Sequence, residues 1–172
     1  MGQHLLRVDL GWTKKKLSQN VKKQASILIR MTTTAKEKYQ LSMAGEYGVC
    51  AELSKRGFDV SITMGNAKAV DIFVVIGTVL RRIEVKTTRS TKFVTNFFQK
   101  YYNPSQSHPD YWVLVYIDSN NNFRFFVLTH QEMGDVQMQR NGMNSWIQNP
   151  GGVDNVLLKH VIEFENQWDK IK

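Results

Sequence analysis

The stretch VDIFVVIGTVLRRIEVKTT, residues 70–88, decides the fold of this chain. Residues 70–76 are almost all apolar and β-branched, which is typical of a strand that is buried on both faces. Gly77-Thr78 follows as a tight turn, and residues 79–88 read as a returning second strand. Asp71 lies inside the first strand. Glu84 and Lys86 lie two residues apart on the second, so they share one face of it.

The length of the turn sets the register of this hairpin. If Gly77-Thr78 is a two-residue loop, Ile76 pairs with Val79, and Asp71 faces Glu84 on the same side of the sheet. Two carboxylates that face each other destabilise a sheet by up to about 1 kcal/mol even when exposed, and beside apolar strands the cost is larger. A divalent cation between them would remove the conflict. A loop of odd length would instead put the two acids on opposite faces.

A long helix is predicted before the hairpin, from Thr34 to Arg56, and Gly57 suits its C-terminal cap. The helix carries one buried stripe, which consists of Met43, Glu46, Val49, Cys50 and Leu53. Glu46 lies in the middle of this stripe. Its carboxylate either reaches out to water along the apolar face or points at something buried.

Together, Glu46 on a helix, Asp71 on a strand and Glu84-Val85-Lys86 on the next strand resemble the PD-(D/E)XK nuclease superfamily. Glu84-Val85-Lys86 is the only Asp/Glu-x-Lys triplet in the chain. Val70 stands where the motif of the family has proline. The resemblance implies a restriction-endonuclease-like core of helix, three strands, helix and strand, and it covers residues 34–117.

The same resemblance implies a function, a cofactor and a set of site residues. Asp71 and Glu84 would be the main ligands of Mg²⁺ or Mn²⁺, with the carbonyl of Val85 as a further ligand. Lys86 would be the catalytic lysine, and Glu46 an additional metal ligand or catalytic carboxylate. Such a site hydrolyses phosphodiester bonds in DNA. The hairpin also resembles that of Holliday-junction resolvases, which makes branched or structured DNA a candidate substrate.

The remaining segments complete an α/β domain. Strands are predicted over residues 58–64, 111–117 and 123–128. A short helix capped by Ser90 or Thr91 is predicted over Phe93, Phe97 and Tyr101, although residues 96–102 would suit a strand too. Thr129 and Glu132 have the spacing of a capping box, so a helix should begin there and end by Asn141-Gly142. A last helix is predicted to begin at Asp154 or Asn155 and to run to Trp168. We therefore expect a central mixed β-sheet flanked by helices, with a C-terminal β-strand and helical extension.

The chain of 172 residues carries a net charge of +8, which suits a polyanionic partner such as DNA, with RNA as an alternative. Residues 1–33 form a basic N-terminal extension, and residues 34–172 form a single nuclease-like domain. The extension suits either a basic helix that contacts a nucleic-acid backbone or a solvated charged segment. The residues predicted to contact nucleic acid are Lys14, Lys15, Lys16, Lys22, Lys23, Thr87, Thr88 and Lys100.

Several classes of protein are disfavoured by composition. The single cysteine, Cys50, permits no disulfide within the chain, and the four histidines form no metal-spaced pair. No apolar run is long enough to span a membrane and no secretory segment is seen at the N-terminus, so a cytoplasmic location is expected. The resemblance to the nuclease superfamily also implies a homodimer as a possible assembly, because one active site cuts one strand of a duplex. The main alternative is a nuclease fold that grips nucleic acid without cutting it.

Overall fold

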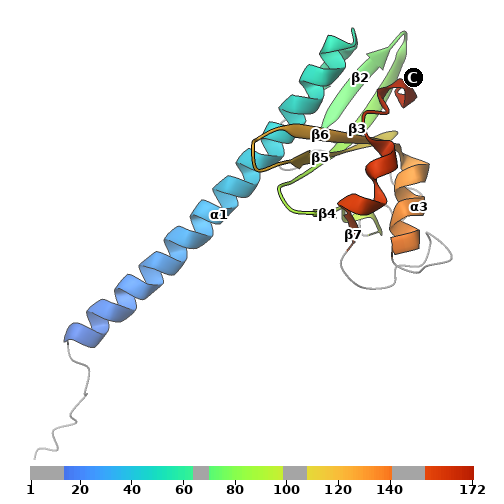
Figure 1. Cartoon of the computed structure of the whole chain (residues 1–172). Helices are drawn as coiled ribbons and strands as arrows, with labels where there is room; N and C mark the ends of the chain where they lie inside the picture. The colour runs from blue at the N-terminus through green and yellow to red at the C-terminus, as the bar shows by residue number, and fades with distance from the viewer. Residues whose placement is uncertain (1–13, 64–69, 99–107, 141–153) are drawn as a thin grey trace, which may run out of the picture. The chain divides into compact units, whose positions relative to one another are not determined.

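The computed structural model describes the backbone of residues 14–63, 70–98, 108–140 and 154–172, and the side chains of those from residue 34 onward (Figure 1). The chain divides into two units, residues 1–39 and residues 40–172. The helix α1, Lys14–Lys55, contributes to both units. It therefore continues without a break through the boundary predicted at residues 33 and 34, and begins well before Thr34.

The C-terminal end of α1 is closed as its sequence predicts. Gly57 has a φ of 84°, a value that glycine adopts without steric cost. The N–H of Gly57 donates to the carbonyl of Ser54, and the N–H of Phe58 donates to that of Leu53. These two bonds are a Schellman cap, which satisfies carbonyls that the helix itself leaves open.

The central sheet has five strands in the order β1-β2-β3-β5-β6. Asp59–Ile62 forms β1, Ile72–Ile76 forms β2 and Val79–Thr88 forms β3, and each is antiparallel to the next. Ile76 pairs with Val79 and Ile72 with Ile83, so the register predicted from a two-residue turn is confirmed. β5, Tyr111–Ile117, lies parallel to β3, and β6, Phe123–Thr129, returns antiparallel to β5.

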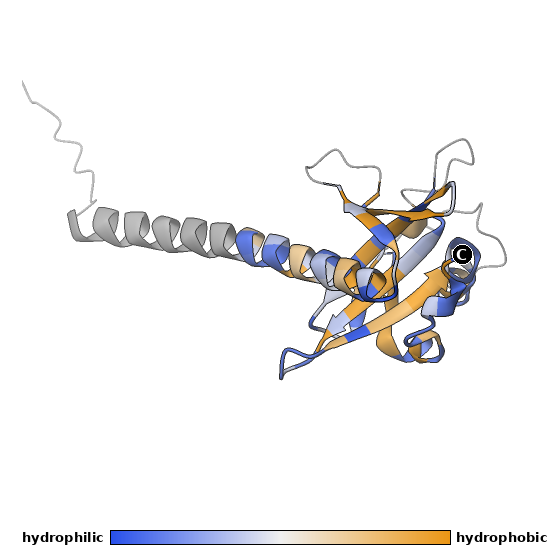
Figure 2. Cartoon of the chain, turned by 90° about the horizontal axis from the view of Figure 1, so that it is seen from above, coloured by the Kyte–Doolittle hydropathy of each residue, from blue (hydrophilic) through white to orange (hydrophobic). Residues whose placement is uncertain are grey.

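The two sides of the sheet carry separate apolar cores, and much of the sheet is coloured as hydrophobic in Figure 2. On what we call the α1 side, Val49 and Leu53 of α1 pack with Ile72, Ile83 and Val85 of the sheet. On the α3 side, the helix α3, His130–Arg140, packs against the alternate residues of β5 and β6, which include Trp112, Leu114, Phe126 and Leu128. Neighbouring residues of one strand thus face different surroundings.

The helix α3 begins at the predicted capping box. The N–H of Glu132 donates to Oγ1 of Thr129, and the N–H of Thr129 donates to Oε2 of Glu132. Within the described residues α3 ends at Arg140, and the predicted end at Asn141-Gly142 lies outside them. No helix of the described residues is long and apolar enough to cross a membrane.

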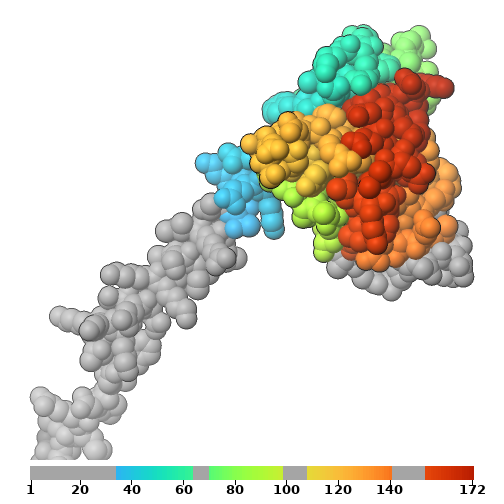
Figure 3. Space-filling view, viewed as in Figure 1, coloured from blue at the N-terminus to red at the C-terminus, as the bar shows by residue number. Residues whose placement is uncertain are grey.

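The predicted last helix is wrong. Asn155–Leu157 forms a strand, β7, that pairs with β4, Lys92–Val94, and three 3₁₀ turns follow: η1, Leu158–His160; η2, Ile162–Phe164; and η3, Trp168–Lys170. This segment covers β6 and the neighbouring part of α3 (Figure 3). Asn166 has a φ of 57° and donates its N–H to the Phe125 carbonyl, which breaks any helical run. The strand β4 also rules out a helix that begins at residue 91, because its backbone bonds to β7.

Candidate active site

Asp71 lies at the entrance to β2 and bonds to the neighbouring strand through its side chain. It precedes the first paired residue, Ile72, so the prediction that it lies inside the strand is wrong by one residue. Its N–H donates to the carbonyl of Ile83 at 3.1 Å, and its Oδ2 accepts the N–H of Val85 at 2.7 Å. The side-chain carboxylate of Asp71 thus accepts the Val85 N–H of β3, which in a regular sheet would bond to a backbone carbonyl of the neighbouring strand. Because the N–H and C=O of one strand residue point to the same edge, the Val85 carbonyl is directed to this edge as well.

Glu84 and Lys86 lie on the α3 side of β3. Ile83 and Val85 belong to the core on the α1 side, so strand alternation directs Glu84 and Lys86 to the opposite side. The same alternation, counted back from Ile72, directs Asp71 to the side of Glu84. Asp71 and Glu84 therefore lie on the same side of the sheet, as the two-residue turn predicts.

The carboxylate of Glu84 is buried and bonded to the ammonium group of Lys86. The Lys86 Nζ lies 2.5 Å from Glu84 Oε1, and the side chains are 21% and 2% exposed, respectively. A carboxylate withdrawn from water needs a compensating charge, and the ammonium group supplies one. Lys86 is the more exposed partner, so it is the member of the pair that a substrate can approach.

An aromatic group lies beside this ion pair. Nζ of Lys86 lies 6.0 Å from the centre of the Trp112 ring, because β5 is parallel to β3 and pairs Trp112 with Glu84. Trp112 is fully buried, as expected for a supporting residue, and its Nε1–H donates to Nδ1 of His130 at 3.1 Å. Sequence reasoning missed this contact of His130, and no local signal points to it, since the two residues lie on different elements.

His130 is held as a neutral ring. Burial, followed by the charge of His108, lowers the pKa of His130 to about 4. Its ring stacks between those of Phe97 and His108, with ring centres 5.1 and 4.2 Å away. A neutral imidazole accepts the tryptophan N–H through Nδ1, so the hydrogen bond and the lowered pKa support each other.

Glu46 approaches from the α1 side of the sheet. It is 2% exposed and accepts a hydrogen bond from Oγ of Ser42 at 3.1 Å. The predicted stripe of α1 is confirmed, since Val49 and Leu53 are fully buried and Met43 and Cys50 partly so. Burial raises the pKa of the Cys50 thiol, and the nearby charge of Glu46 raises it further.

A close contact between Gly45 and Thr87 brings α1 onto β3. A Cβ atom at Gly45 would lie 1.8 Å from Oγ1 of Thr87, so only glycine fits there. Sequence reasoning missed this role, although a glycine inside a helix lowers its stability and is a signal of close packing. The contact fixes the neighbouring Glu46 beside the end of β3 that carries Lys86.

The predicted nucleic-acid contacts fall into three groups. The hydroxyl oxygen of Thr87 is buried, and it lies against Gly45 of α1. Thr88 bonds to Ser90 through their hydroxyl groups. The remaining ones lie outside the residues whose side chains the structure describes: Lys14, Lys15, Lys16, Lys22, Lys23 and Lys100.

The donor atoms at this site fit a hard divalent cation. Asp71, Glu84 and the Val85 carbonyl offer oxygen only, which is what Mg²⁺ prefers, and Mg²⁺ often uses one or two carboxylates while keeping bound water. Among the described residues, no three Asp, Glu, His or Cys side chains are gathered as a ready-made metal site. An ion here would be held by the carboxylates of Asp71 and Glu84 and by the carbonyl of Val85.

Two solved structures are similar to this chain. One is the bacterial homing endonuclease I-Ssp6803I, at 11% identity and a TM-score of 0.48, with 76% of this chain and 88% of that chain covered. The other is Hjc, a Holliday junction resolvase from Archaeoglobus fulgidus, at 14% identity and a TM-score of 0.40, with 70% and 92% covered. Neither a protein-family model nor a curated protein matches the chain. Independently of these similarities, the helix α1, the antiparallel strands β1-β2-β3 and the parallel strand β5 follow the order of elements that the PD-(D/E)XK resemblance predicted.

Proposed function

We propose that this protein is a divalent-metal-dependent endonuclease that hydrolyses phosphodiester bonds in DNA. One observation carries the proposal: the buried Glu84 is bonded to Lys86, and the carboxylate of Asp71 is anchored on the backbone of Val85 between them. Two carboxylates and a lysine on the neighbouring strands β2 and β3 are groups that can hold a divalent ion and orient a water molecule for phosphodiester hydrolysis. An Mg²⁺ or Mn²⁺ ion bound there would polarise the phosphate and offer a position for water.

Each residue has a distinct role in this proposal. Asp71 and Glu84 hold the ion, with the carbonyl of Val85 as a third oxygen. The ammonium group of Lys86 orients the attacking water and offsets the charge that develops on the phosphate. Glu46 is an additional carboxylate for the ion or for its bound water. The indole of Trp112 lies beside the ammonium group of Lys86, with its ring centre 6.0 Å from Nζ.

The choice of DNA as substrate rests on charge and on the resemblance. A net charge of +8 attracts a polyanion and favours association with a phosphate backbone. Branched or structured DNA belongs to the proposal because the hairpin resembles that of junction resolvases. Since one site cuts one strand, cleavage of both strands calls for a homodimer.

The test is cleavage of linear, circular and four-way DNA in the presence of Mg²⁺, Mn²⁺ or EDTA. We expect metal-dependent products from the unchanged chain, and a loss of about 10²–10³ in rate for Glu84→Gln and for Lys86→Met, the usual effect of removing one electrostatic group. Asp71→Asn should behave alike. Asp59→Asn is the matched control, because Asp59 is an exposed acid on the adjacent strand β1. Full activity of Asp71→Asn would overturn the assigned site.

A non-cleaving nucleic-acid-binding module is the second candidate. It is favoured by the absence of a three-ligand group within the described residues and by the engagement of Lys86 with Glu84. Salt-sensitive binding of DNA without cleavage, together with no calorimetric signal for Mn²⁺, would support this candidate over the first.

A further inference from the structure

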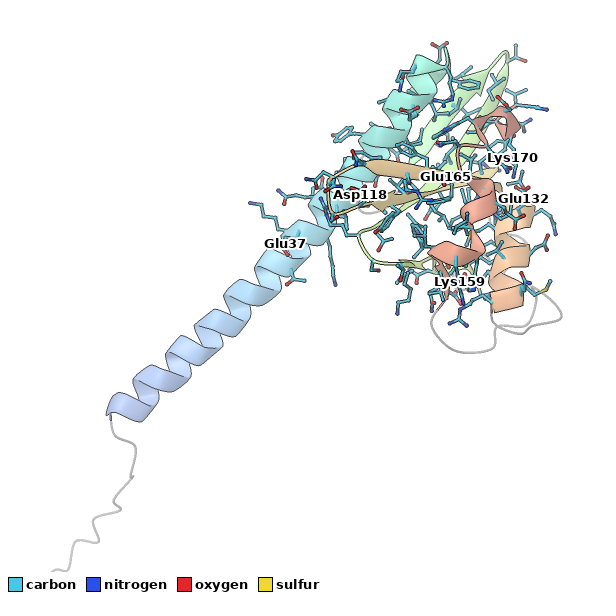
Figure 4. The ribbon with its side chains drawn as sticks, viewed as in Figure 1. Glu37, Asp118, Glu132, Lys159, Glu165 and Lys170 are labelled. Carbon is cyan, nitrogen blue, oxygen red and sulfur yellow. The ribbon has the colours of Figure 1, made fainter. Side chains whose placement is uncertain are left out.

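A cavity of about 660 Å³ opens between the last turns of α3 and the turns that follow β7. It shares no described residue with the candidate active site. The lining combines polar and charged side chains with two apolar ones; the described residues that line it are Val136, Gln139, Arg140, Leu157, Lys159, His160 and Glu163. Figure 4 labels Lys159, which lies on the turn after β7.

Two permanent cations line this cavity without an ion-pair partner. Every described ion pair of the chain involves other residues, so neither Arg140 nor Lys159 is neutralised by a carboxylate in the described part of the chain. Glu163 is the one acid among the described lining residues, and it likewise makes no ion pair there. By contrast, Lys170, also labelled in Figure 4, is paired with Glu132 at 2.6 Å. The described lining therefore carries two cations and one carboxylate, which leaves a net positive charge.

His160 adds a directed hydrogen-bond donor. Its Nδ1 accepts the N–H of Leu157 at 3.5 Å, so the neutral ring carries its proton on Nε2. Burial lowers the pKa of His160, and the positive charges of Lys159 and then Arg140 lower it further. The charges of Lys159 and Arg140 are therefore both felt at the imidazole of His160. An anion bound among the three side chains would reduce the repulsion between the two cations.

We propose that this cavity binds a phosphate group of a DNA backbone, at a distance from the phosphate that is cut. The proposal rests on the proposed function for the identity of the ligand. Arginine and lysine are the residues that most often contact backbone phosphates, and the cavity is large enough for the phosphate with its adjoining sugars. The carbonyl end of α3 disfavours an anion, so the two cations must outweigh it. Removal of both should abolish phosphate binding at this cavity and weaken the binding of DNA by the whole chain.

The test compares the unchanged chain with Lys159→Gln and with the double variant Arg140→Gln/Lys159→Gln, using fluorescence anisotropy with a short duplex DNA in EDTA at several KCl concentrations. Loss of one phosphate-binding cation should weaken binding and reduce the slope of log K against log salt by about 1. Lys172→Gln is the matched control: it removes one exposed lysine charge outside the cavity and should leave the slope nearly unchanged. Circular dichroism of each variant checks that it is folded.

A second measurement uses inorganic phosphate and a mononucleotide as probes, followed by NMR of the His160 imidazole. Phosphate should shift its signals in the unchanged chain and not in the double variant. If the double variant binds duplex DNA as tightly as Lys172→Gln, and only its response to the mononucleotide is lost, the site serves a free nucleotide and the backbone assignment is overturned. No change with any probe also overturns it. Because binding is measured without metal, a failure of cleavage would leave this result intact.

Discussion

The two sides of β3 differ in chemistry although they belong to one strand. Ile83 and Val85 face α1 within a continuous apolar core, whereas Glu84 and Lys86 face the α3 side as a buried ion pair. On the apolar side, the residues contribute by filling space, and they pack the hairpin against α1. The charged side places a carboxylate where water cannot reach it, which costs stability unless a cation compensates it. The charged side therefore contributes less to stability than the apolar side, and the proposed function assigns it a chemical role.

The largest expected effect comes from the apolar side. Ile83→Ala should lower the free energy of unfolding by about 2–5 kcal/mol, because a fully buried isoleucine leaves a cavity that the sheet cannot close. Urea denaturation measures this. Leu80→Ala, on the same strand but 55% exposed, is the control and should change stability little. Equal effects at the two positions would contradict the division of β3.

Removal of Lys86 and removal of Glu84 should lower the free energy of unfolding by different amounts. Lys86→Met leaves Glu84 charged at a position that is 2% exposed, and should lower stability by about 3 kcal/mol in EDTA. Glu84→Gln should cost much less, because the longer and more exposed Lys86 can turn to water. The double variant should be more stable than Lys86→Met alone. A larger cost for Glu84→Gln than for Lys86→Met would mean that the pair serves the fold.

Gly45→Ala tests how α1 meets the α1 side of β3. The added Cβ would meet Oγ1 of Thr87, so α1 must shift, at a cost of about 1–3 kcal/mol. Because Glu46 follows directly, cleavage should fall along with stability. Thr87→Ala added to the variant should restore part of both, as a double-mutant cycle would measure. Gly57, which has open space around it, offers no such clash.

The smallest expected effect is a pH dependence from the α3 side. Because burial lowers the pKa of His130 to about 4 in the folded chain, the unfolded chain binds the proton more readily between about pH 6.5 and 4. Stability should therefore fall as pH decreases through that window, by about 1–2 kcal/mol after solvent screening is allowed for. Thermal melts of the unchanged chain and of His130→Gln measure the difference. A stability of the unchanged chain that rises on acidification, relative to His130→Gln, would contradict this.

Much of the fold was predictable because it depends on short-range rules. The register of β2 and β3 follows from a two-residue turn, and the cap at Gly57 and the capping box at Thr129 are local patterns. The C-terminal segment was not predictable in this way. Its buried residues include Val156, Val161 and Trp168, and their surroundings are set by β4 and β6, which lie far away in the sequence.

Within the candidate site, the sequence by itself determined that Glu84 and Lys86 share a face, because side chains two residues apart on a strand point the same way. The sequence also predicted the hairpin register that brings Asp71 to that strand, on condition of a two-residue turn, and the pairing of Ile76 with Val79 confirmed it. Only the tertiary structure decided that Trp112 lies beside Lys86, that His130 bonds to Trp112, and that Glu46 approaches from the opposite side of the sheet. Local spacing defines the direction of a side chain, but the neighbour it meets depends on the pairing of distant strands and on the packing of helices against the sheet.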